Sequence, residues 1–388
     1  MPVRSAGRTA NVRPGPRGPA ALLSPWSRWH GVSWLAAGPW SGPGVEWRCV
    51  VRKSVAVVAA LLCLSGGVSA QGAAPLKLAQ RFRLPATVKG SLDHLSVDVG
   101  GKRLFVAAED DHAVLVLDLE TGALVHTIGG IGRPHAILFR PGLNGIYVTD
   151  GAKGDLKIYD GKTYRPVLST KLGPDTDAIG YDPATKYLYV DSDGSDPHKK
   201  YSLLNMVDTS SGYKGTDMHL DGDGLRAMAL EKAGPRIYVD NEAKNEVDVI
   251  DRENWTLVGR WPVTMGQHNT AIALDEGGHR LFVGCRSGEV VVFDTETGKE
   301  IKALPIGAGV DDLAFDAMNN RLYAVSGGGG GSISVYQEKG GDQFESLGRV
   351  VSGPGAKTGC LVTALRKFFV SVPAHGSDPA EVLVYDLQ

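Results

Sequence analysis

The sequence predicts an all-β protein, a seven-bladed β-propeller with four-stranded blades, and three observations support this prediction. A short aromatic strand recurs seven times in the 388-residue chain at intervals of 41 to 49 residues, and its central residues are Phe105, Tyr147, Tyr189, Tyr238, Phe282, Tyr323 and Phe369. A period of roughly 40–45 residues with several short strands is typical of one propeller blade. Apolar and polar residues alternate over short runs bounded by Gly, Pro, Asn and Asp. No helical periodicity of useful length follows residue 75.

The second repeat shows how four strands fit into one unit. An alternating run begins at His135 and turns at residues 141–145, and further strand patterns follow at residues 146–149, 156–159 and 166–172. Its third strand has counterparts elsewhere in the chain, at Val114–Asp118, Val247–Asp251, Val290–Asp294 and Val382–Asp386. Turn-forming residues separate each pair of patterns, so we expect antiparallel strands connected in chain order.

The two ends of the repeat region complement each other. The chain stops at Gln388, directly after the third strand pattern of the seventh unit, while Leu76–Leu84 form one strand pattern ahead of the first inner strand. Placing this N-terminal strand in the last blade completes that blade and leaves no exposed sheet edge at the junction. We therefore expect residues 71–388 to form a single closed β-propeller domain.

The first 70 residues have a different composition. Residues 1–50 are rich in Arg, Pro, Gly and Trp, and Glu46 is their one acid. Arg52 and Lys53, an apolar run at Val55–Leu64 and small residues up to Ala70 then form a Sec-type signal peptide over residues 51–70, with cleavage after Ala70. The apolar run is shorter than the ~20 residues that span a bilayer. We interpret residues 1–50 as a non-native extension from a start site placed too early; a disordered basic leader is the alternative.

Cleavage after Ala70 would yield a periplasmic or secreted protein without a transmembrane segment. It would leave 33 basic and 42 acidic side chains, a net charge of about −9. Such a chain offers no general attraction to nucleic acid, so we expect no nucleic-acid partner, and we expect a monomer. Cys285 and Cys360 remain; they fall in strands two blades apart, beyond the ~7 Å between Cα atoms that a disulfide allows, so we expect both to be unpaired.

One strand motif carries a family resemblance. Tyr147–Asp150 reads Tyr-Val-Thr-Asp, with relatives at Tyr189–Asp191 and Tyr238–Asp240. Glu-Thr-Gly turns follow the third strands at Glu120–Gly122 and Glu296–Gly298. Over the whole mature chain this pattern resembles the YVTN-repeat β-propeller family, which implies a seven-bladed propeller and a secreted or periplasmic bacterial protein. Related seven-bladed propellers include lactone hydrolases, quinoprotein-associated subunits and a periplasmic DNA-binding propeller; the acidic mature chain disfavours the last.

A column of polar residues lies twelve positions before each central aromatic residue, at the start of each inner strand: Asp93, His135, Asp177, Arg226, Thr270, Asp311 and Lys357. Neighbouring positions add further polar residues, among them His94, His268 and Asn269. Inner strands converge on the central channel, so we expect a ring of polar side chains at its mouth. The candidate ligand-binding residues are Asp93, His94, His135, Asp177, Arg226, His268, Asn269 and Asp311.

This mixture of imidazoles, carboxylates and a guanidinium suits an anionic or zwitterionic small molecule, with Arg226 binding a carboxylate or phosphate. The alternative is structural, because polar residues at a crowded axis often only satisfy backbone N–H groups. No cofactor is predicted. A divalent metal held by Asp177, Asn269 and Asp311 is a further alternative, since carboxylate and amide oxygens bind such ions.

Three functional hypotheses follow. The first is a secreted or periplasmic propeller that binds a small ligand or a protein partner at the channel mouth without catalysis, because G-x-S-x-G, H-E-x-x-H and C-x-x-C-H motifs are absent. The second is a lactone hydrolase, in which His135 or His268 activates water, Arg226 stabilises the oxyanion and a metal can replace the base. The third is a subunit of an extracytoplasmic redox complex. The residues favour the first and leave enzymatic activity undecided.

Overall fold

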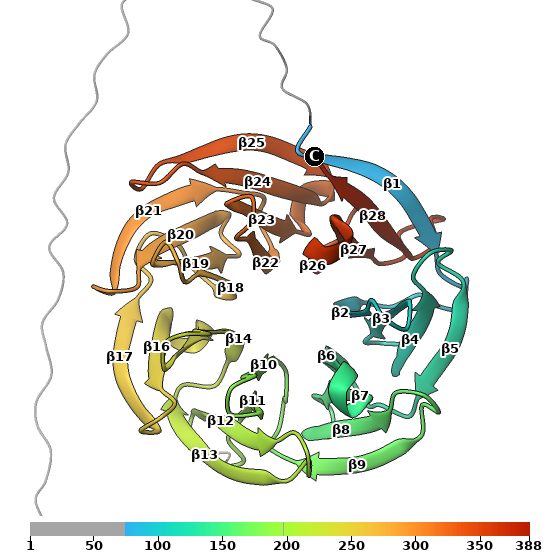
Figure 1. The fold of residues 1–388 in the computed structure, drawn as a ribbon, viewed down its shortest axis with the longest axis horizontal. Helices are drawn as coiled ribbons and strands as arrows, with labels where there is room; N and C mark the ends of the chain where they lie inside the picture. The colour runs from blue at the N-terminus through green and yellow to red at the C-terminus, as the bar shows by residue number, and fades with distance from the viewer. Residues whose placement is uncertain (1–73, 197) are drawn as a thin grey trace, which may run out of the picture. The chain divides into compact units, whose positions relative to one another are not determined.

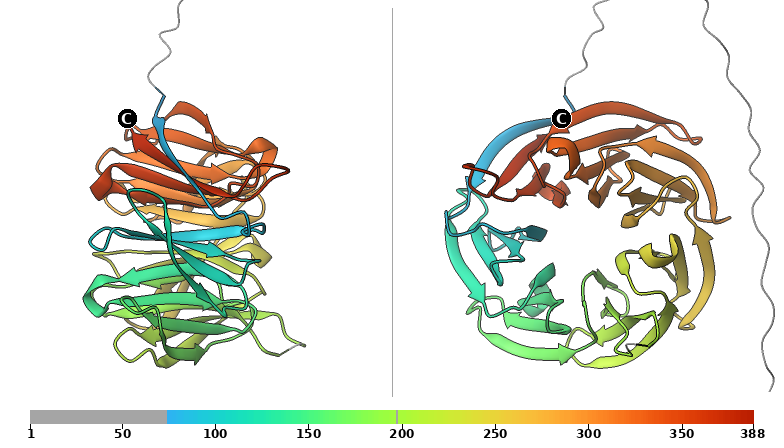
Figure 2. Two further views of the ribbon diagram at one scale, coloured as in Figure 1. Left: turned by 90° about the vertical axis from the view of Figure 1, so that its right-hand side faces the viewer. Right: turned by 180° about the vertical axis from the view of Figure 1, so that it is seen from behind.

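Seven four-stranded antiparallel sheets surround one central channel in the computed structural model, which describes residues 74–196 and 198–388 (Figure 1). Within each sheet the first strand is innermost and the fourth is outermost, as the view from behind also shows (Figure 2). The predicted fold is therefore confirmed. The predicted extension at 1–50 and signal peptide at 51–70 lie outside the described residues.

Each of the seven blades consists of four strands. Blades 1 to 3 contain β2 (Leu92–Asp98), β3 (Arg103–Ala108), β4 (Ala113–Asp118), β5 (Leu124–Gly129); β6 (Pro134–Arg140), β7 (Gly145–Asp150), β8 (Asp155–Asp160), β9 (Pro166–Lys171); and β10 (Ile179–Tyr181), β11 (Tyr187–Asp193), β12 (Tyr201–Asp208), β13 (Lys214–Asp221). Blades 4 and 5 contain β14 (Leu225–Leu230), β15 (Arg236–Asn241), β16 (Glu246–Asp251), β17 (Thr256–Pro262); and β18 (Asn269–Asp275), β19 (Arg280–Cys285), β20 (Glu289–Asp294), β21 (Lys299–Pro305). Blades 6 and 7 contain β22 (Val310–Asp316), β23 (Arg321–Ser326), β24 (Ser332–Glu338), β25 (Phe344–Val351); and β26 (Gly359–Val362), β27 (Lys367–Val372), β28 (Glu381–Leu387), β1 (Leu76–Arg83).

Helical structure in the described residues is limited to single turns of 3-10 helix between strands: η1 (Pro141–Leu143), η2 (Glu242–Lys244), η3 (Gly328–Gly330) and η4 (Thr363–Leu365). None of these turns approaches the length or apolar character that a membrane-spanning helix requires. Cys285 is buried and Cys360 is half-buried, and both are free thiols, as expected from their positions two blades apart.

The ring is closed by the N-terminal strand. β1 pairs antiparallel with β28, from Leu76 opposite Leu387 to Arg83 opposite Glu381, and so supplies the fourth strand of blade 7 (Figure 1). This pairing confirms the prediction made from the unpartnered strand pattern at 76–84. It brings the first and last described strands into one sheet, so that blade 7 packs on blade 1 like any other pair of neighbours.

The hydrophobic core is divided among the blade interfaces. Seven clusters of buried apolar residues each join two neighbouring blades. The recurring aromatic residues lie at the centre of these clusters; Phe105, Phe282 and Phe369, for example, are completely buried. Aromatic pairs cross the interfaces, as where the ring centroids of Phe105 and Phe139 lie 5.7 Å apart. Each blade thus buries its faces only against its neighbours, which explains the repeat period.

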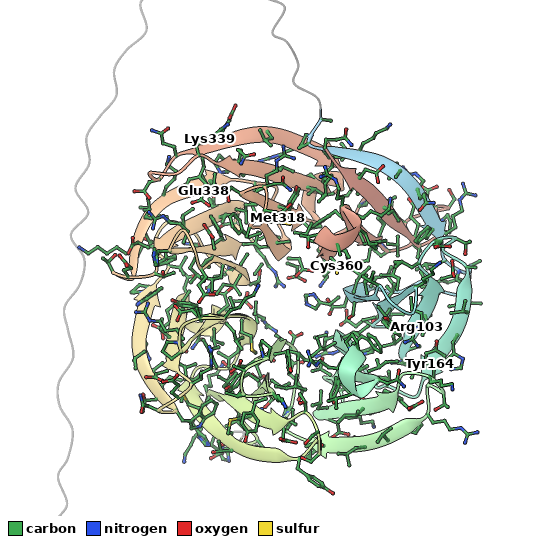
Figure 3. The ribbon with its side chains drawn as sticks, viewed as in Figure 1. Arg103, Tyr164, Met318, Glu338, Lys339 and Cys360 are labelled. Carbon is green, nitrogen blue, oxygen red and sulfur yellow. The ribbon has the colours of Figure 1, made fainter. Side chains whose placement is uncertain are left out.

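Repeated polar contacts fix the outer parts of the blades. Arg103 pairs with Asp98 at 2.6 Å and lies over the ring of Phe139, while its Nη1 donates to the hydroxyl of Tyr164 at 3.2 Å (Figure 3). Arg103 therefore joins blade 1 to blade 2.

Hydrogen bonds also stabilise the first Glu-Thr-Gly turn, as expected. Asp118 accepts hydrogen bonds from the backbone and side chain of Thr121, both at 2.8 Å.

Phe82 of β1 shows how ring closure depends on one side chain. It is 3% exposed and belongs to the cluster between blades 7 and 1. Its ring packs on Gly122, where φ is +72° and an added Cβ would lie 2.2 Å from the ring. Only glycine leaves room for this contact. Gly122 in the turn of blade 1 therefore allows β1, the strand that completes blade 7, to pack against that turn.

We predict that Phe82→Ala lowers the free energy of unfolding by about 3–5 kcal/mol, because it removes a buried aromatic ring and leaves a cavity. Urea denaturation followed by tryptophan fluorescence measures this change. Val167→Ala is the control, because Val167 is 65% exposed on the outer strand β9, and it should change stability by less than about 0.5 kcal/mol. Equal effects of the two substitutions would contradict the proposed role of β1 in closing the ring.

Candidate functional site

Irregularities at the start of the inner strands direct the polar column toward the channel. The pairing of inner and second strands skips residues between Leu92 and Leu95, and the equivalent skip recurs in blades 2, 4, 5 and 6. The skipped positions include five members of the column: Asp93, His135, Arg226, Thr270 and Asp311. A β-bulge turns the side chain of its extra residue away from the regular strand direction. In blades 3 and 7, Asp177 and Lys357 lie two residues before the inner strand begins.

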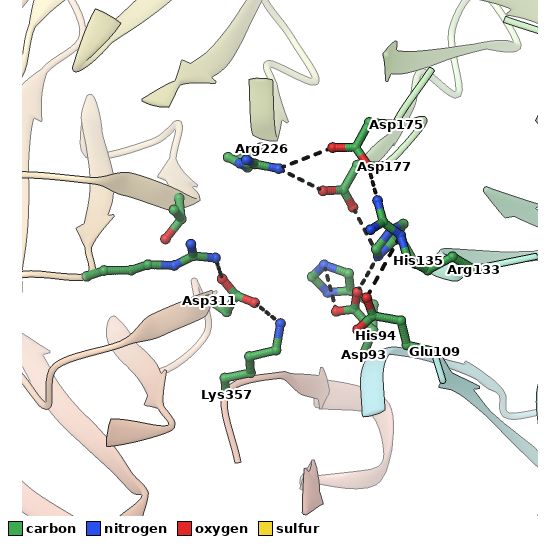
Figure 4. Close-up of a pocket in the computed structure, with 12 residues that line it drawn as sticks. Asp93, His94, Glu109, Arg133, His135, Asp175, Asp177, Arg226, Asp311 and Lys357 are labelled. Atoms are coloured by element: carbon green, nitrogen blue, oxygen red, sulfur yellow. Dashed lines mark hydrogen bonds and ion pairs between the residues drawn. The ribbon is translucent and has the colours of Figure 1, made fainter. Parts of the chain in front are cut away.

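These side chains surround a cavity of about 280 Å³ at the channel mouth (Figure 4). Its lining residues are Asp93, His94, Glu109, Arg133, His135, Asp175, Asp177, Arg226, Thr270, Arg286, Asp311 and Lys357. All seven members of the column are among them. Six of the eight candidate ligand-binding residues line the cavity, namely Asp93, His94, His135, Asp177, Arg226 and Asp311. The structure thus brings most of the predicted set together.

The other two candidates, His268 and Asn269, do not line the cavity. Asn269 is fully buried, and its Nδ2 donates to Asp240 Oδ1 at 2.7 Å and to the carbonyl of Glu246 at 3.0 Å. His268 lies outside the lining, with a side chain that is 70% exposed. The bulge in β18 places Thr270 in the lining instead. Of the predicted metal set, Asp177 and Asp311 line the cavity, whereas Asn269 does not and directs its Nδ2 to Asp240.

Seven charged residues that line the cavity alternate in sign with Glu242, which pairs with two of them. We call these eight residues the charge ring: Glu109, Arg133, Asp175, Arg226, Glu242, Arg286, Asp311 and Lys357. Short contacts join Arg133 to Asp175, Arg226 Nε to Glu242 Oε2 at 2.8 Å, Arg286 Nη2 to Asp311 Oδ1 at 2.6 Å and Lys357 Nζ to Asp311 Oδ2 at 2.5 Å. Every blade contributes at least one member. The charge ring therefore links all seven blades at the same end of the channel.

Some other contacts of charge-ring residues are longer. Arg133 Nε lies 4.0 Å from Glu109 Oε1. Arg226 Nη1 lies 3.8 Å from Asp175 Oδ2 and 3.9 Å from Asp177 Oδ2. These two distances exceed a hydrogen bond, so Nη1 of Arg226 makes no short contact with either carboxylate.

A smaller cluster of Asp93, His94, His135 and Asp177 lies within the charge ring, and we call it the floor cluster. His135 Nδ1 lies 2.7 Å from Asp93 Oδ2, and both residues are buried. Across the cluster, His94 Nδ1 lies 3.2 Å from Asp312 Oδ2, and His94 Nε2 lies 3.7 Å from Asp93 Oδ1. Asp93 Oδ1 and His135 Nε2 have no hydrogen-bond partner among the described residues.

The floor cluster shifts the protonation of its members. Burial opposes ionisation of Asp93, yet His94, the hydrogen bond from His135 and Lys357 together lower its pKa. Burial lowers the pKa of His94, but the carboxylates of Asp312 and Asp93 outweigh burial and raise the pKa well above its ordinary value. Burial raises the pKa of Asp177 to about 6, although His135 opposes this shift. The neighbouring carboxylates thus favour the protonated form of His94.

Second-strand residues hold Asp177 in position. Asp191 Oδ1 accepts hydrogen bonds from the backbone N–H groups of Asp177 at 3.2 Å and Ala178 at 2.7 Å. Thr149 of the preceding blade donates to the carbonyl of Asp177 at 2.7 Å. The segment that carries Asp177 is therefore fixed on both sides although it lies outside a regular strand.

Six members of the charge ring were not among the candidates. Lys357 belongs to the polar column, and Arg133 and Asp175 each lie two residues before a column member. The other three are Glu109, Glu242 and Arg286. Each lies four residues after a central aromatic residue, Phe105, Tyr238 and Phe282 respectively. This second equivalent position follows the second strand and reaches the same end of the channel as the start of the inner strand. Counting from the central aromatic residues thus identifies this position as well as the first column.

Comparison with known proteins supports the fold and leaves the function open. No family model matches this chain. Over 99 residues it is 33% identical to the "Uncharacterized protein YncE" of Salmonella typhimurium and 32% identical to the protein of that name of Salmonella typhi. Each match covers 25% of this chain and 28% of the relative, so the chain matches little more than a quarter of the length of these curated relatives. Membership of the YVTN-repeat family stays a prediction.

Among solved structures, a chain of Kuenenia stuttgartiensis hydrazine synthase superposes with a TM-score of 0.66. The match covers 77% of this chain and 97% of that chain, at 16% sequence identity. An identity this low shows a shared fold alone.

We predict that Asp311→Asn lowers the free energy of unfolding by about 1–2 kcal/mol, because two partly hydrated cations, Arg286 and Lys357, lose their shared carboxylate. The control is Glu120→Gln, which removes the partner of Lys102 in an exposed pair and should cost less than about 0.5 kcal/mol. Urea denaturation at low and high salt measures both. A loss in Asp311→Asn no larger than in the control would show that the charge ring does not stabilise the blade contacts.

Proposed function

We propose that this propeller binds a small anion-bearing molecule, a carboxylate or a phosphate ester, in the cavity at the channel mouth. The observation that carries the proposal is that equivalent positions of all seven blades converge on one cavity lined entirely by polar side chains. Drug-sized ligands occupy pockets of roughly 300–1,000 Å³. A cavity of about 280 Å³ therefore suits a small metabolite rather than a macromolecular segment.

Arg226 is the residue that we expect to bind the anionic group. Its Nε is held by Glu242 at 2.8 Å, which fixes the guanidinium, while its Nη1 makes no contact shorter than 3.8 Å with the neighbouring carboxylates. A guanidinium positioned in this way can donate two parallel hydrogen bonds to a carboxylate or phosphate. Lys357 and Arg286 line the same cavity and add positive charge on its other side.

Lactone hydrolysis has less support than binding. The proposed base His135 uses Nδ1 for its hydrogen bond to Asp93. Its Nε2 is buried, and a Cβ added at Gly151 would lie 2.8 Å from it. With Nδ1 bonded to Asp93 and Nε2 buried, the position of His135 gives little support to a role as general base. His268 lies outside the cavity lining. The redox-subunit hypothesis rests on the likeness of fold alone.

We further propose that the ligand is bound outside the cytoplasm by a monomer. This setting rests on the signal peptide predicted at residues 51–70. The polar cavity is of a size that holds a small solute. A protein partner would instead need a larger contact area.

Titration calorimetry with three probes, inorganic phosphate, citrate and L-glutamate, tests the binding proposal. We predict that at least one probe binds, and that Arg226→Gln weakens its binding by tenfold or more because the forked donor is lost. Arg226→Lys should restore only part of the affinity, since it keeps the charge without the fork. The control is Arg81→Gln on the outer strand β1, whose partner is Glu381.

Two results would overturn the proposal. One is the absence of binding by all three probes at millimolar concentration. The other is equal affinity in the native protein and in Arg226→Gln, provided that circular dichroism shows both to be folded.

A further inference from the structure

We propose that Asp93, His94 and Asp177 of the floor cluster bind a divalent transition-metal ion. One nitrogen from His94 and one oxygen from each carboxylate lie within 4.8 Å of one another. His94 Nε2 and Asp93 Oδ1 are 3.7 Å apart, which is too long for a hydrogen bond. Two ligand atoms that each lie about 2.1 Å from one ion are separated by distances of this size.

The unpartnered oxygen of Asp93 is the first observation in favour of an ion. Asp93 is 4% exposed, and its Oδ2 accepts the hydrogen bond from His135. Its Oδ1 lies in the same cluster without a hydrogen-bond partner among the described residues. A buried carboxylate oxygen without a hydrogen-bond partner is unfavourable, because it has lost its water without replacement. A bound cation would satisfy it.

The orientation of His94 is the second observation. Its Nδ1 lies 3.2 Å from Asp312 Oδ2, and Asp312 Oδ2 also accepts the backbone N–H of Gly359 at 2.9 Å. A histidine that binds a metal through one nitrogen usually donates the other N–H to a carboxylate, which fixes its ring. Asp312 has this position, so His94 Nε2 is left to face Asp93.

These two observations favour a metal over an organic ammonium group. An organic ammonium group needs only hydrogen-bond acceptors, which the two carboxylates supply by themselves. An imidazole ring held in place by Asp312 is instead typical of a metal ligand. A set of one imidazole and two carboxylates suits zinc, manganese or iron better than calcium or magnesium, which prefer oxygen ligands. Metal binding would displace the proton from His94.

A second set, Asp93, Glu109 and His135, is also within reach of one ion. His135 Nδ1 already forms a 2.7 Å hydrogen bond with Asp93, so binding there would break an existing contact. An ion bound by Asp93, His94 and Asp177 would not break a hydrogen bond as short as 2.7 Å, because His94 Nε2 and Asp93 Oδ1 are 3.7 Å apart. His135 therefore acts as a positioning residue for Asp93 in this proposal.

The metal site also refines the ligand class. Three protein ligands leave coordination positions open, and Arg226 Nη1 lies 3.9 Å from Asp177 Oδ2 on the same cavity (Figure 4). A carboxylate or phosphate group can then bind the ion and Arg226 together. This refinement rests on the proposed function, whereas the metal site itself does not.

Calorimetric titration of the EDTA-treated, dialysed protein with zinc chloride and, separately, manganese chloride tests the site. We expect one ion per chain, and a loss of affinity of at least tenfold in His94→Gln and in Asp177→Asn. Asp312→Asn should weaken binding by about tenfold, because removal of an outer-shell partner costs 10–100-fold. Glu109→Gln is the matched control, which removes a nearby carboxylate that is absent from the proposed set, and it should bind the ion with native affinity.

The proposal is overturned if neither ion binds more tightly than about 100 μM, or if His94→Gln binds with native affinity. It is equally overturned if Glu109→Gln abolishes binding, which would assign the ion to the other set. If circular dichroism shows His94→Gln to be unfolded, Asp312→Asn decides in its place, since it leaves the ligand atoms intact. Repeating the anion titrations on metal-free protein separates the two proposals, because anion binding that needs Arg226 but no metal would sustain the function alone.

Discussion

The antiparallel pairing of β1 with β28 joins the first and last described strands in one sheet, and the geometry of the channel mouth depends on it. Each blade packs only on its two neighbours, so an open ring would leave two sheet faces without a partner. Closure fixes the rotation between successive blades and therefore the positions at which seven inner strands approach the axis. Phe82 and Gly122 show the fit at this junction, where a ring from one blade occupies the space that a missing Cβ leaves in the next.

In the closed ring, the β-bulges direct polar side chains of the inner strands toward the channel axis, where they form the candidate site. A regular inner strand would alternate its side chains between the two blade faces, whereas the bulged residue turns toward the axis. Because the bulge recurs at the same place in five blades, polar side chains far apart in the sequence meet around one cavity. Of these residues, Arg226 and Asp311 form ion pairs within the charge ring, and the charge ring is largely satisfied without a ligand.

The floor cluster differs from the charge ring in this respect. Lys357, Arg286 and Asp311 satisfy one another at short distances, which is the behaviour of a structural network. Asp93 keeps one oxygen unpartnered among the described residues, and His94 is held with one nitrogen toward it. Arg226, fixed by Glu242, adds a donor edge that no carboxylate contacts closely. The free oxygen of Asp93 and the free edge of Arg226 can still bind a ligand, whereas residues that form short ion pairs already have their partners.

The sequence by itself determined the blade count, the strands, the closing strand and the polar column, because each follows from a pattern that repeats within about 45 residues. Six of the eight candidate residues reach the cavity for the same reason. Only the tertiary structure decided the rest. The count from Phe282 placed Thr270 in the polar column, but only the structure shows that its neighbours His268 and Asn269 do not line the cavity. The buried amide of Asn269 instead faces Asp240. The pairing of Asp312 with His94 joins residues 218 positions apart, and such contacts depend on how blades close around the axis rather than on any local pattern.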